Sequence, residues 1–215
     1  MPVGVFIADD HGIIRSGLKT LIESQQDMVV IGEADNGVDA VTRVIELRPD
    51  VVIMDISMPR LNGTEATKQI SDALPEIKVV ILSMHHTDEH VFRAMKAGAR
   101  GYILKESAGP EVVNAVRAVM AGDYFFGNGV QEPPADHHRR GWQRSKSPIE
   151  SLSSREREVL QLVAEGRTSI EIANMLSISQ KSVETYRSRL MQKLGIENVA
   201  ALVKFAVAHG LTPSS

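Results

Sequence analysis

The chain has 215 residues, of which 43% are hydrophobic and 24% are charged, so it is long enough for one large or two ordinary soluble domains. It contains no cysteine, which excludes disulfides and thiolate metal sites and fits a reducing compartment. No apolar stretch approaches the length of a membrane span, and the N-terminus lacks the pattern of a signal peptide. We therefore expect a cytoplasmic protein without a membrane partner.

Residues 1–122 alternate apolar runs with amphipathic segments. This alternation predicts a doubly wound α/β domain with a parallel five-stranded sheet. We expect strands near residues 3–8, 28–33, 50–54, 78–82 and 101–104, and helices near residues 12–25, 37–48, 64–73, 88–98 and 110–121.

Charged and polar side chains follow four of these strands. Asp9 and Asp10 follow the first strand, Asp55 the third, Ser83 the fourth and Lys105 the fifth. Because the carboxyl ends of parallel strands lie at one edge of a sheet, we expect these side chains to form one site. Clustered carboxylates repel one another and are stabilised by a hard cation such as Mg²⁺. An aspartate can attack phosphorus, and a lysine and a hydroxyl can hold the transferred group, so the set suits phosphoryl capture.

Each of these residues, taken alone, also has an ordinary structural explanation. Asp10 can cap a helix or form a turn, and Lys105 can be a solvated lysine. Tyr102, a further candidate three residues before Lys105, can belong to the core of the sheet. The order of the residues along the chain and their positions at strand ends favour the functional interpretation.

Residues 123–148 break the alternation of strands and helices. Residues 123–129 carry three aromatic side chains and can pack back on the first domain. The remainder has prolines, glycines and charges without apolar periodicity, which predicts a linker. Its basic run around Trp142 is interpreted as a solvated tether, with contact to nucleic acid as the alternative. A metal site at His137 and His138 is not expected, because no further ligands lie nearby at helical spacing.

Residues 149–215 predict an all-helical domain. Two capping boxes, Ser153 to Glu156 and Thr168 to Glu171, each open a helix. After a brief turn, a longer helix runs from about residue 180 to 194 and ends at Gly195. A short helix, a tight turn and a longer basic helix are typical of a helix-turn-helix.

The longer helix is the candidate reader of DNA. Its apolar residues recur at helical spacing and should face the core, which leaves outward residues to contact bases or phosphates: Lys181, Glu184, Thr185, Arg187, Ser188, Arg189 and Lys193. Thr185 and Ser188 suit base choice, and Arg187 and Lys193 suit phosphate contacts. An ordinary solvated helix face is the alternative.

The net charge of −3 argues weakly against nucleic-acid binding, but it is unevenly distributed. Residues 1–122 hold 12 basic and 17 acidic side chains, whereas residues 149–215 hold 8 basic and 7 acidic ones. The acidic excess therefore belongs to the part of the chain with the expected metal site.

The motifs of residues 1–122 together resemble the receiver domain of two-component response regulators. The resemblance rests on Asp9-Asp10, Asp55 followed by Pro59 and Gly63, Ser83, and Tyr102 three residues before Lys105. It implies that Asp55 accepts phosphate from a histidine kinase, and that Mg²⁺ is held by Asp9, Asp10, Asp55 and the backbone carbonyl of Ser57. It also implies that Ser83 and Tyr102 form a switch pair, with Tyr102 turning inward as Ser83 moves toward the phosphate, and that Lys105 pairs with the phosphate. Glu106 departs from the family, because many receivers have proline there.

The last domain is similar to the LuxR-type DNA-binding domain. The similarity rests on residues 152–160, on Glu171-Ile172-Ala173, and on residues 181–186 with Lys193-Leu194-Gly195. With a receiver in front, the chain resembles the NarL/FixJ group of response regulators, with domains at 1–122 and 149–215 and a linker at 123–148. The resemblance implies a phosphorylation-dependent transcriptional regulator that is not an enzyme, binds double-stranded DNA and forms a homodimer on activation.

Two rival functions also fit parts of this sequence. A phosphatase that uses an aspartyl phosphate would need a second carboxylate two residues after the nucleophile, where this chain has Ser57. A receiver coupled to a protein- or RNA-binding bundle is the other rival. Titration of duplex DNA at several salt concentrations would separate it, because phosphate contacts give a steep salt dependence.

Overall fold

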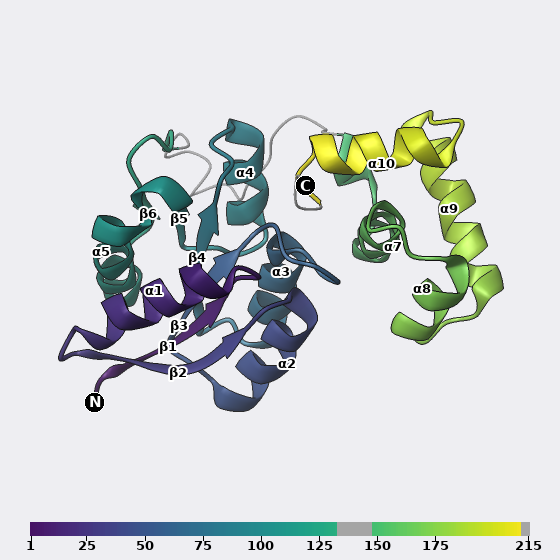
Figure 1. Cartoon of the computed structure of the whole chain (residues 1–215). Coiled ribbons are helices and arrows are strands. Elements are labelled where there is room, and N and C mark those ends of the chain that lie inside the picture. The colour runs from purple at the N-terminus through teal and green to yellow at the C-terminus, as the bar shows by residue number, and fades with distance from the viewer. Residues whose placement is uncertain (133–147, 212–215) are drawn as a thin grey trace. The chain divides into compact units, whose positions relative to one another are not determined.

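The computed structural model describes residues 1–132 and 148–211 of the chain. The chain divides into two compact units, Met1–Gln143 and Arg144–Ser215 (Figure 1). The histidine pair and Trp142 of the expected linker lie outside the described residues.

The first unit is built on a parallel sheet. Its strand order is β2-β1-β3-β4-β5-β6, and every neighbouring pair runs in the same direction. The strands are β1 (Val3–Ala8), β2 (Met28–Ala34), β3 (Val51–Asp55), β4 (Lys78–Ser83), β5 (Gly101–Leu104) and β6 (Phe125–Phe126). The helices are α1 (Gly12–Glu23), α2 (Gly37–Leu47), α3 (Gly63–Ala73), α4 (Asp88–Lys96) and α5 (Ala108–Ala121), with a 3₁₀ turn η1 (Lys105–Ser107) before α5. The doubly wound parallel fold is confirmed.

Successive strand residues supply the two faces of this sheet. Val5, Ile7 and Ile53 pack with residues of α1 and α5, whereas Phe6 and Met54 pack with residues of α2, α3 and α4. Helices therefore cover both faces (Figure 1), and the central strands are buried on both sides. This explains why these strands are continuous apolar runs, since neither face meets water.

A sixth strand extends the predicted five-stranded sheet. Phe125 donates its backbone N–H to Arg100 O at 3.0 Å, and Gly127 donates to Tyr102 O at 2.9 Å. The aromatic segment at residues 123–129 thus packs back on the first domain, as its sequence predicted. The guanidinium carbon of Arg100 also lies 4.9 Å from the ring centre of Tyr124.

The second unit is helical, as predicted. It contains η2 (Pro148–Ser151), α7 (Ser154–Ala164), α8 (Ser169–Met175), α9 (Gln180–Leu194) and α10 (Val199–Ala208). Both predicted capping boxes are formed, at Ser153 with Glu156 and at Thr168 with Glu171. Gly195 ends α9 at a φ of 65°, a conformation that glycine adopts without strain. None of the helices in the described part of the chain has the length and hydrophobicity of a membrane span.

Candidate functional site

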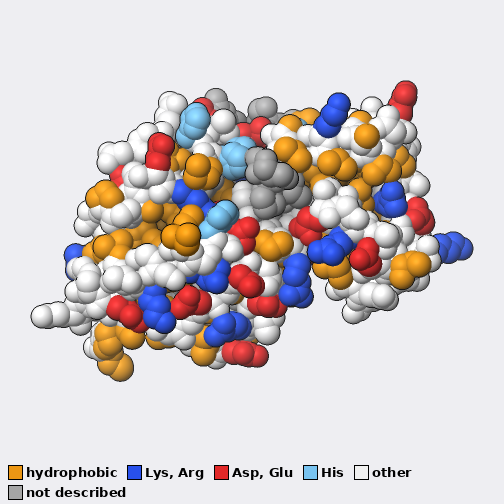
Figure 2. Space-filling view, in the orientation of Figure 1, with side chains coloured by type: hydrophobic (Ala, Val, Ile, Leu, Met, Phe, Trp, Pro, Cys, Tyr) orange, Lys and Arg blue, Asp and Glu red, His pale blue; other side chains and the backbone are white. Residues whose placement is uncertain are grey.

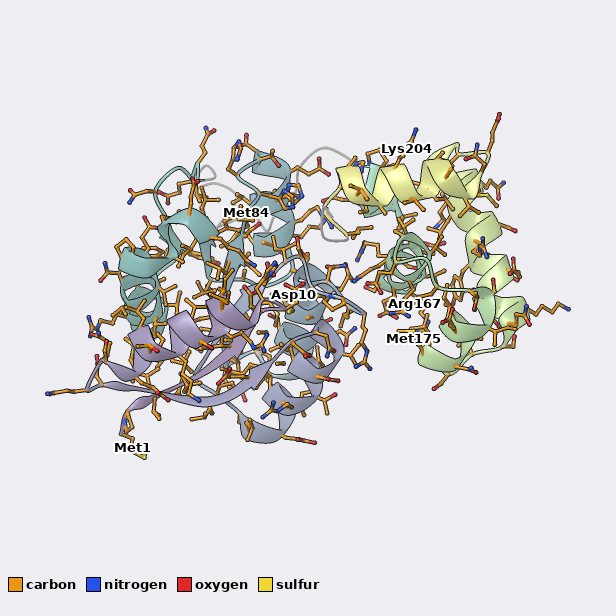
Figure 3. The ribbon with its side chains drawn as sticks, in the orientation of Figure 1. Met1, Asp10, Met84, Arg167, Met175 and Lys204 are labelled. Atoms are coloured by element: carbon orange, nitrogen blue, oxygen red, sulfur yellow. The ribbon has the colours of Figure 1, made fainter. Side chains whose placement is uncertain are left out.

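The carboxyl-terminal edge of the sheet brings together the side chains that the strand ends predicted. Asp9 and Asp55 are buried, at 0% and 1% exposure, and Lys105 enters from the end of β5. Asp10, which Figure 3 labels, directly follows Asp9 at this edge and is only half-buried.

Lys105 joins the two buried carboxylates. Its Nζ lies 2.8 Å from Asp9 Oδ2 and 2.9 Å from Asp55 Oδ2, and its side chain is 7% exposed. The other oxygen of Asp55, Oδ1, accepts a hydrogen bond from the backbone N–H of Ser57 at 3.2 Å. Burial in the sheet edge and the neighbouring charge of Asp9 raise the pKa of Asp55 to about 6, although Lys105 opposes this shift. Burial alone would lower the pKa of Lys105, but the two carboxylates outweigh it and the pKa is raised.

His11 belongs to this cluster, and the strand-end pattern did not predict it. Its backbone N–H donates to Asp9 Oδ1 at 2.8 Å, and its ring Nδ1 lies 2.6 Å from Asp10 Oδ1. The signal was its position immediately after the aspartate pair, at the residue that precedes α1. Arg15, one turn into α1, donates to the backbone oxygen of Asp9 at 2.7 Å and so helps to fix the loop.

The acidic cluster has the donor set that a hard cation needs. One ligand atom from each of Asp9, Asp10, His11 and Asp55 can be chosen so that all four lie within 4.8 Å of one another. Two buried carboxylate oxygens, Asp9 Oδ2 and Asp10 Oδ1, accept no hydrogen bond of regular geometry. Asp9 Oδ2 lies close to Lys105 Nζ, and Asp10 Oδ1 lies close to the ring nitrogen of His11. Buried carboxylate oxygens with spare acceptor capacity are suited to a divalent cation.

The expected switch pair lies beside this cluster. Ser83 Oγ accepts the backbone N–H of His85 at 2.9 Å, and the Tyr102 hydroxyl donates to His85 O at 2.6 Å. The ring of Tyr102 is fully buried, and burial raises the pKa of its hydroxyl to about 12. In the described conformation the ring of Tyr102 therefore lies inside the domain. The exposed side chain of Met84 borders the site (Figure 3), and with Ser83, Leu104 and Lys105 it lines a small pocket of about 60 Å³.

The helix α9 presents the candidate DNA-reading residues as the sequence predicted. Val183 and Leu190 are buried in the core of the unit, whereas the outward residues are exposed or half-buried, namely Lys181, Glu184, Thr185, Arg187, Ser188, Arg189 and Lys193. On the visible face of the second unit, Figure 2 shows acidic and basic side chains mixed rather than one continuous basic patch.

Three of the outward residues have partners on other helices of the unit. Ser169 at the start of α8 donates its hydroxyl to Glu184 and accepts a hydrogen bond from Arg187 Nη1, the latter at 2.8 Å. Lys193 Nζ lies 2.8 Å from Glu156 Oε2, the carboxylate of the first capping box. Helical spacing could not predict these pairs, because the partners lie on other helices.

Two family comparisons match the two units. Residues 5–117 match the response regulator receiver domain, and residues 150–206 match the bacterial regulatory proteins of the luxR family. The chain belongs to the NarL family of two-component response regulators. It joins a receiver domain to a LuxR-type DNA-binding domain, as the sequence motifs implied.

Relatives and solved structures agree with this assignment. The chain is 38% identical over 213 residues to the oxygen regulatory protein NreC of Staphylococcus epidermidis, covering 96% of this chain and 98% of that protein. It is 36% identical over 211 residues to the uncharacterized transcriptional regulatory protein YxjL of Bacillus subtilis, covering 97% of each. A structure of the RcsB response regulator of Salmonella typhimurium is similar with a TM-score of 0.65 at 28% identity, over 97% of this chain and 98% of that one. An RcsB–DNA complex has a TM-score of 0.63 at 27% identity, over 95% and 98% of the two chains.

Proposed function

We propose that Asp55 is the phosphoacceptor of this response regulator and that its phosphorylation controls DNA binding or dimerisation by the C-terminal domain. The observation that carries the proposal is the contact of one lysine, Lys105, with the two buried carboxylates of Asp9 and Asp55. A buried nucleophile held beside a cation is suited to an incoming phosphoryl group, whose negative charge needs neutralisation. The phosphodonor is a histidine kinase, since a receiver domain is the part of a two-component system that takes phosphate from one.

The chemical step uses few groups. A carboxylate oxygen of Asp55 attacks the phosphorus of a phosphohistidine, the phosphorus–nitrogen bond breaks, and the imidazole keeps the electron pair. Lys105 then pairs with a phosphoryl oxygen, and the hydroxyl of Ser83 donates a hydrogen bond to another. Mg²⁺, held by Asp9, Asp10, Asp55 and the backbone carbonyl of Ser57, would neutralise charge on the carboxylates and on the phosphoryl group.

The proposed DNA interface is the exposed face of α9. Thr185 and Ser188 are short and uncharged, so they are assigned to base choice, and Lys181 and Arg189 can meet bases or phosphates. Glu184, Arg187 and Lys193 have partners in the unbound unit, so contact with DNA would require these side chains to exchange partners. The known RcsB–DNA complex supports DNA as the partner, and a structure described as two RcsB dimers bound to two parallel DNAs supports a homodimer.

The proposal also assigns a domain to each part of the chain. We assign residues 1–122 to the receiver, 123–148 to the linker and 149–215 to the DNA-binding domain. The aromatic start of the linker packs on the receiver sheet through β6. Regulation of transcription in the cytoplasm, without catalysis of a separate reaction, is the role that this organisation favours.

The first test is phosphate uptake. The full chain is incubated with acetyl phosphate and Mg²⁺ and its intact mass is measured, with Asp55→Asn as the comparison. The parent should gain one phosphoryl group that is lost on treatment with hydroxylamine, and the variant should gain none. Equal uptake by the variant would contradict the assignment of Asp55.

A further inference from the structure

One buried carboxylate of the receiver has no part in phosphoryl capture. Glu111 lies in the first turn of α5 and is 6% exposed. Its Oε2 accepts a hydrogen bond from the hydroxyl of Ser107 at 2.9 Å, and its Oε1 accepts the backbone N–H of Asn128 at 2.8 Å. A single side chain therefore ties two separate segments to α5.

The first of these segments begins at the phosphate-pairing lysine. The turn η1 runs from Lys105 to Ser107, so the hydroxyl that donates to Glu111 lies two residues after the lysine that contacts Asp55. The Ser107 hydroxyl also lies 3.2 Å from Leu104 O, the last residue of β5. A short turn with this hydrogen bond therefore connects Lys105 to Ser107.

The second segment is the start of the linker. Gly127 donates its N–H to Tyr102 O at 2.9 Å, and the N–H of Val130 returns to Gly127 O at 3.0 Å. The packing against Glu111 is close, because a Cβ at Gly127 would collide with Glu111 Oε2. Glu111 thus holds the chain at the point where it leaves the receiver toward the linker.

We propose that Glu111 is a positioning residue that couples the phosphorylation state of Asp55 to the start of the linker at residues 127–130. The proposal rests on the proposed role of Asp55. When Lys105 moves onto the phosphoryl group, η1 follows and the Ser107 hydroxyl leaves Glu111. A buried carboxylate oxygen that loses its donor is unfavourable, so the side chain turns toward water and releases the N–H of Asn128. The linker then departs from the receiver with more freedom than before.

Hydrogen–deuterium exchange on the full chain tests this coupling. In the parent, acetyl phosphate with Mg²⁺ should speed exchange of the amides at residues 127–130 by roughly tenfold, the effect of losing one hydrogen bond to a charged group. Ser107→Ala removes the donor of η1 but leaves Asn128 and Glu111 in place. Its amides at 127–130 should exchange fast even without the phosphodonor, and phosphorylation should add little. Glu111→Ala should behave in the same way.

Asn114→Ala is the matched control, because Asn114 lies one turn further along α5, is exposed, and within the described part of the chain makes one long contact, 3.4 Å, to Pro110 O. It should respond as the parent does. DNA affinity supplies a readout that a purely structural role would not move: Ser107→Ala should reduce the phosphorylation-dependent gain in affinity by at least about threefold, without changing phosphate uptake.

Two results would overturn the coupling and leave the phosphoacceptor intact. One is a parent that gains phosphate by mass and binds DNA more tightly, yet shows no change of exchange at residues 127–130. The other is that Ser107→Ala responds to phosphorylation as the parent does. This result would count against the coupling even if Glu111→Ala failed to fold. Failure of the parent to gain phosphate would instead reject both proposals.

Discussion

At the scale of single residues, Asp55 combines a functional need with an energetic cost. In its proposed role the side chain must be a carboxylate to attack phosphorus, yet burial and Asp9 raise its pKa from 3.8 to about 6. The folded chain therefore binds this proton more tightly than the unfolded chain does. Protonation of Asp55 therefore adds to the unfolding free energy of the chain. This contribution is complete below about pH 4 and is lost as the pH rises through about 6.

Asp55→Asn should remove this dependence on pH. The amide has the shape of the carboxylate without its charge, so without Mg²⁺ the variant should exceed the parent in unfolding free energy by about 1–2 kcal/mol at pH 7.5. The difference should shrink toward pH 5, where the parent becomes protonated. Urea denaturation of both proteins at the two pH values measures it. If the unfolding free energies of the parent and the variant depended on pH in the same way, the carboxylate with the raised pKa would not be Asp55.

Lys105→Ala should damage signalling more than phosphate uptake. The lysine pairs with Asp9 and Asp55 and begins η1, so its loss removes the group that responds to the phosphoryl group. We expect phosphorylation by acetyl phosphate to persist, while the phosphorylation-dependent gain in DNA affinity largely disappears. The two quantities are measured by intact mass and by titration of a duplex. A variant whose DNA affinity still rises as in the parent would show that another residue transmits the signal.

At the scale of elements, the contact between α7 and α9 gives a structural role to Lys193, a residue predicted from the sequence to contact phosphate. Burial would raise the pKa of Glu156, but the hydrogen bonds from Lys193 and Ser153 outweigh it and lower the pKa below 4.5. This carboxylate therefore stabilises the helical unit above about pH 4.5, and the stabilisation is lost as the pH falls through the lowered pKa.

Lys193→Ala should destabilise the helical unit at neutral pH by about 1 kcal/mol, because Glu156 would lose a charged hydrogen-bond partner. It should also make the unit less sensitive to acid. Lys204→Ala, a change at an exposed lysine on α10, is the matched control (Figure 3). Thermal unfolding from pH 3 to 7 distinguishes the variants. If stability is unchanged and the salt dependence of DNA binding instead falls by about one unit, Lys193 is a phosphate contact as the sequence predicted.

Thr185→Ala tests the other class of residue on α9. Its hydroxyl donates to Lys181 O at 2.9 Å, and the residue is exposed. We expect the variant to lose preference for a cognate over a scrambled duplex while keeping the salt dependence of the parent. Binding to both duplexes over a salt series measures this. An equal loss on both sequences would place the base-reading face elsewhere.

The elements themselves were predictable where local patterns decide the structure. Buried strands follow from continuous apolar runs, and the capping boxes fix where α7 and α8 begin. The two-residue strand β6 is too short to give a period, and its backbone pairs with residues about 25 positions earlier in the chain. The helix α10 is almost wholly apolar, so it lacks the alternation that identifies an amphipathic helix. The position of His11 and the partner of Lys193 depend on side-chain contacts that spacing does not encode.

At the scale of the whole molecule, the function requires one unit to change the behaviour of the other. The receiver has the acidic excess and the proposed phosphoacceptor, and the helical unit has the proposed DNA-reading helix. We expect acetyl phosphate with Mg²⁺ to increase both the sedimentation coefficient of the full chain and its affinity for a selected duplex. Asp55→Asn should show neither change. An increase in the variant would mean that the phosphodonor acts at another site.

The strand β6 also determines how the receiver behaves when it is separated from the rest. A fragment that stops at residue 122 removes β6 and uncovers the backbone carbonyls of Arg100 and Tyr102 along β5. Bare sheet edges of this kind pair with one another, so such a fragment should aggregate with time and concentration. A fragment that extends to Val130 keeps the edge covered and should remain monodisperse. The end point chosen for recombinant production therefore decides whether the isolated receiver is usable for crystallisation or spectroscopy.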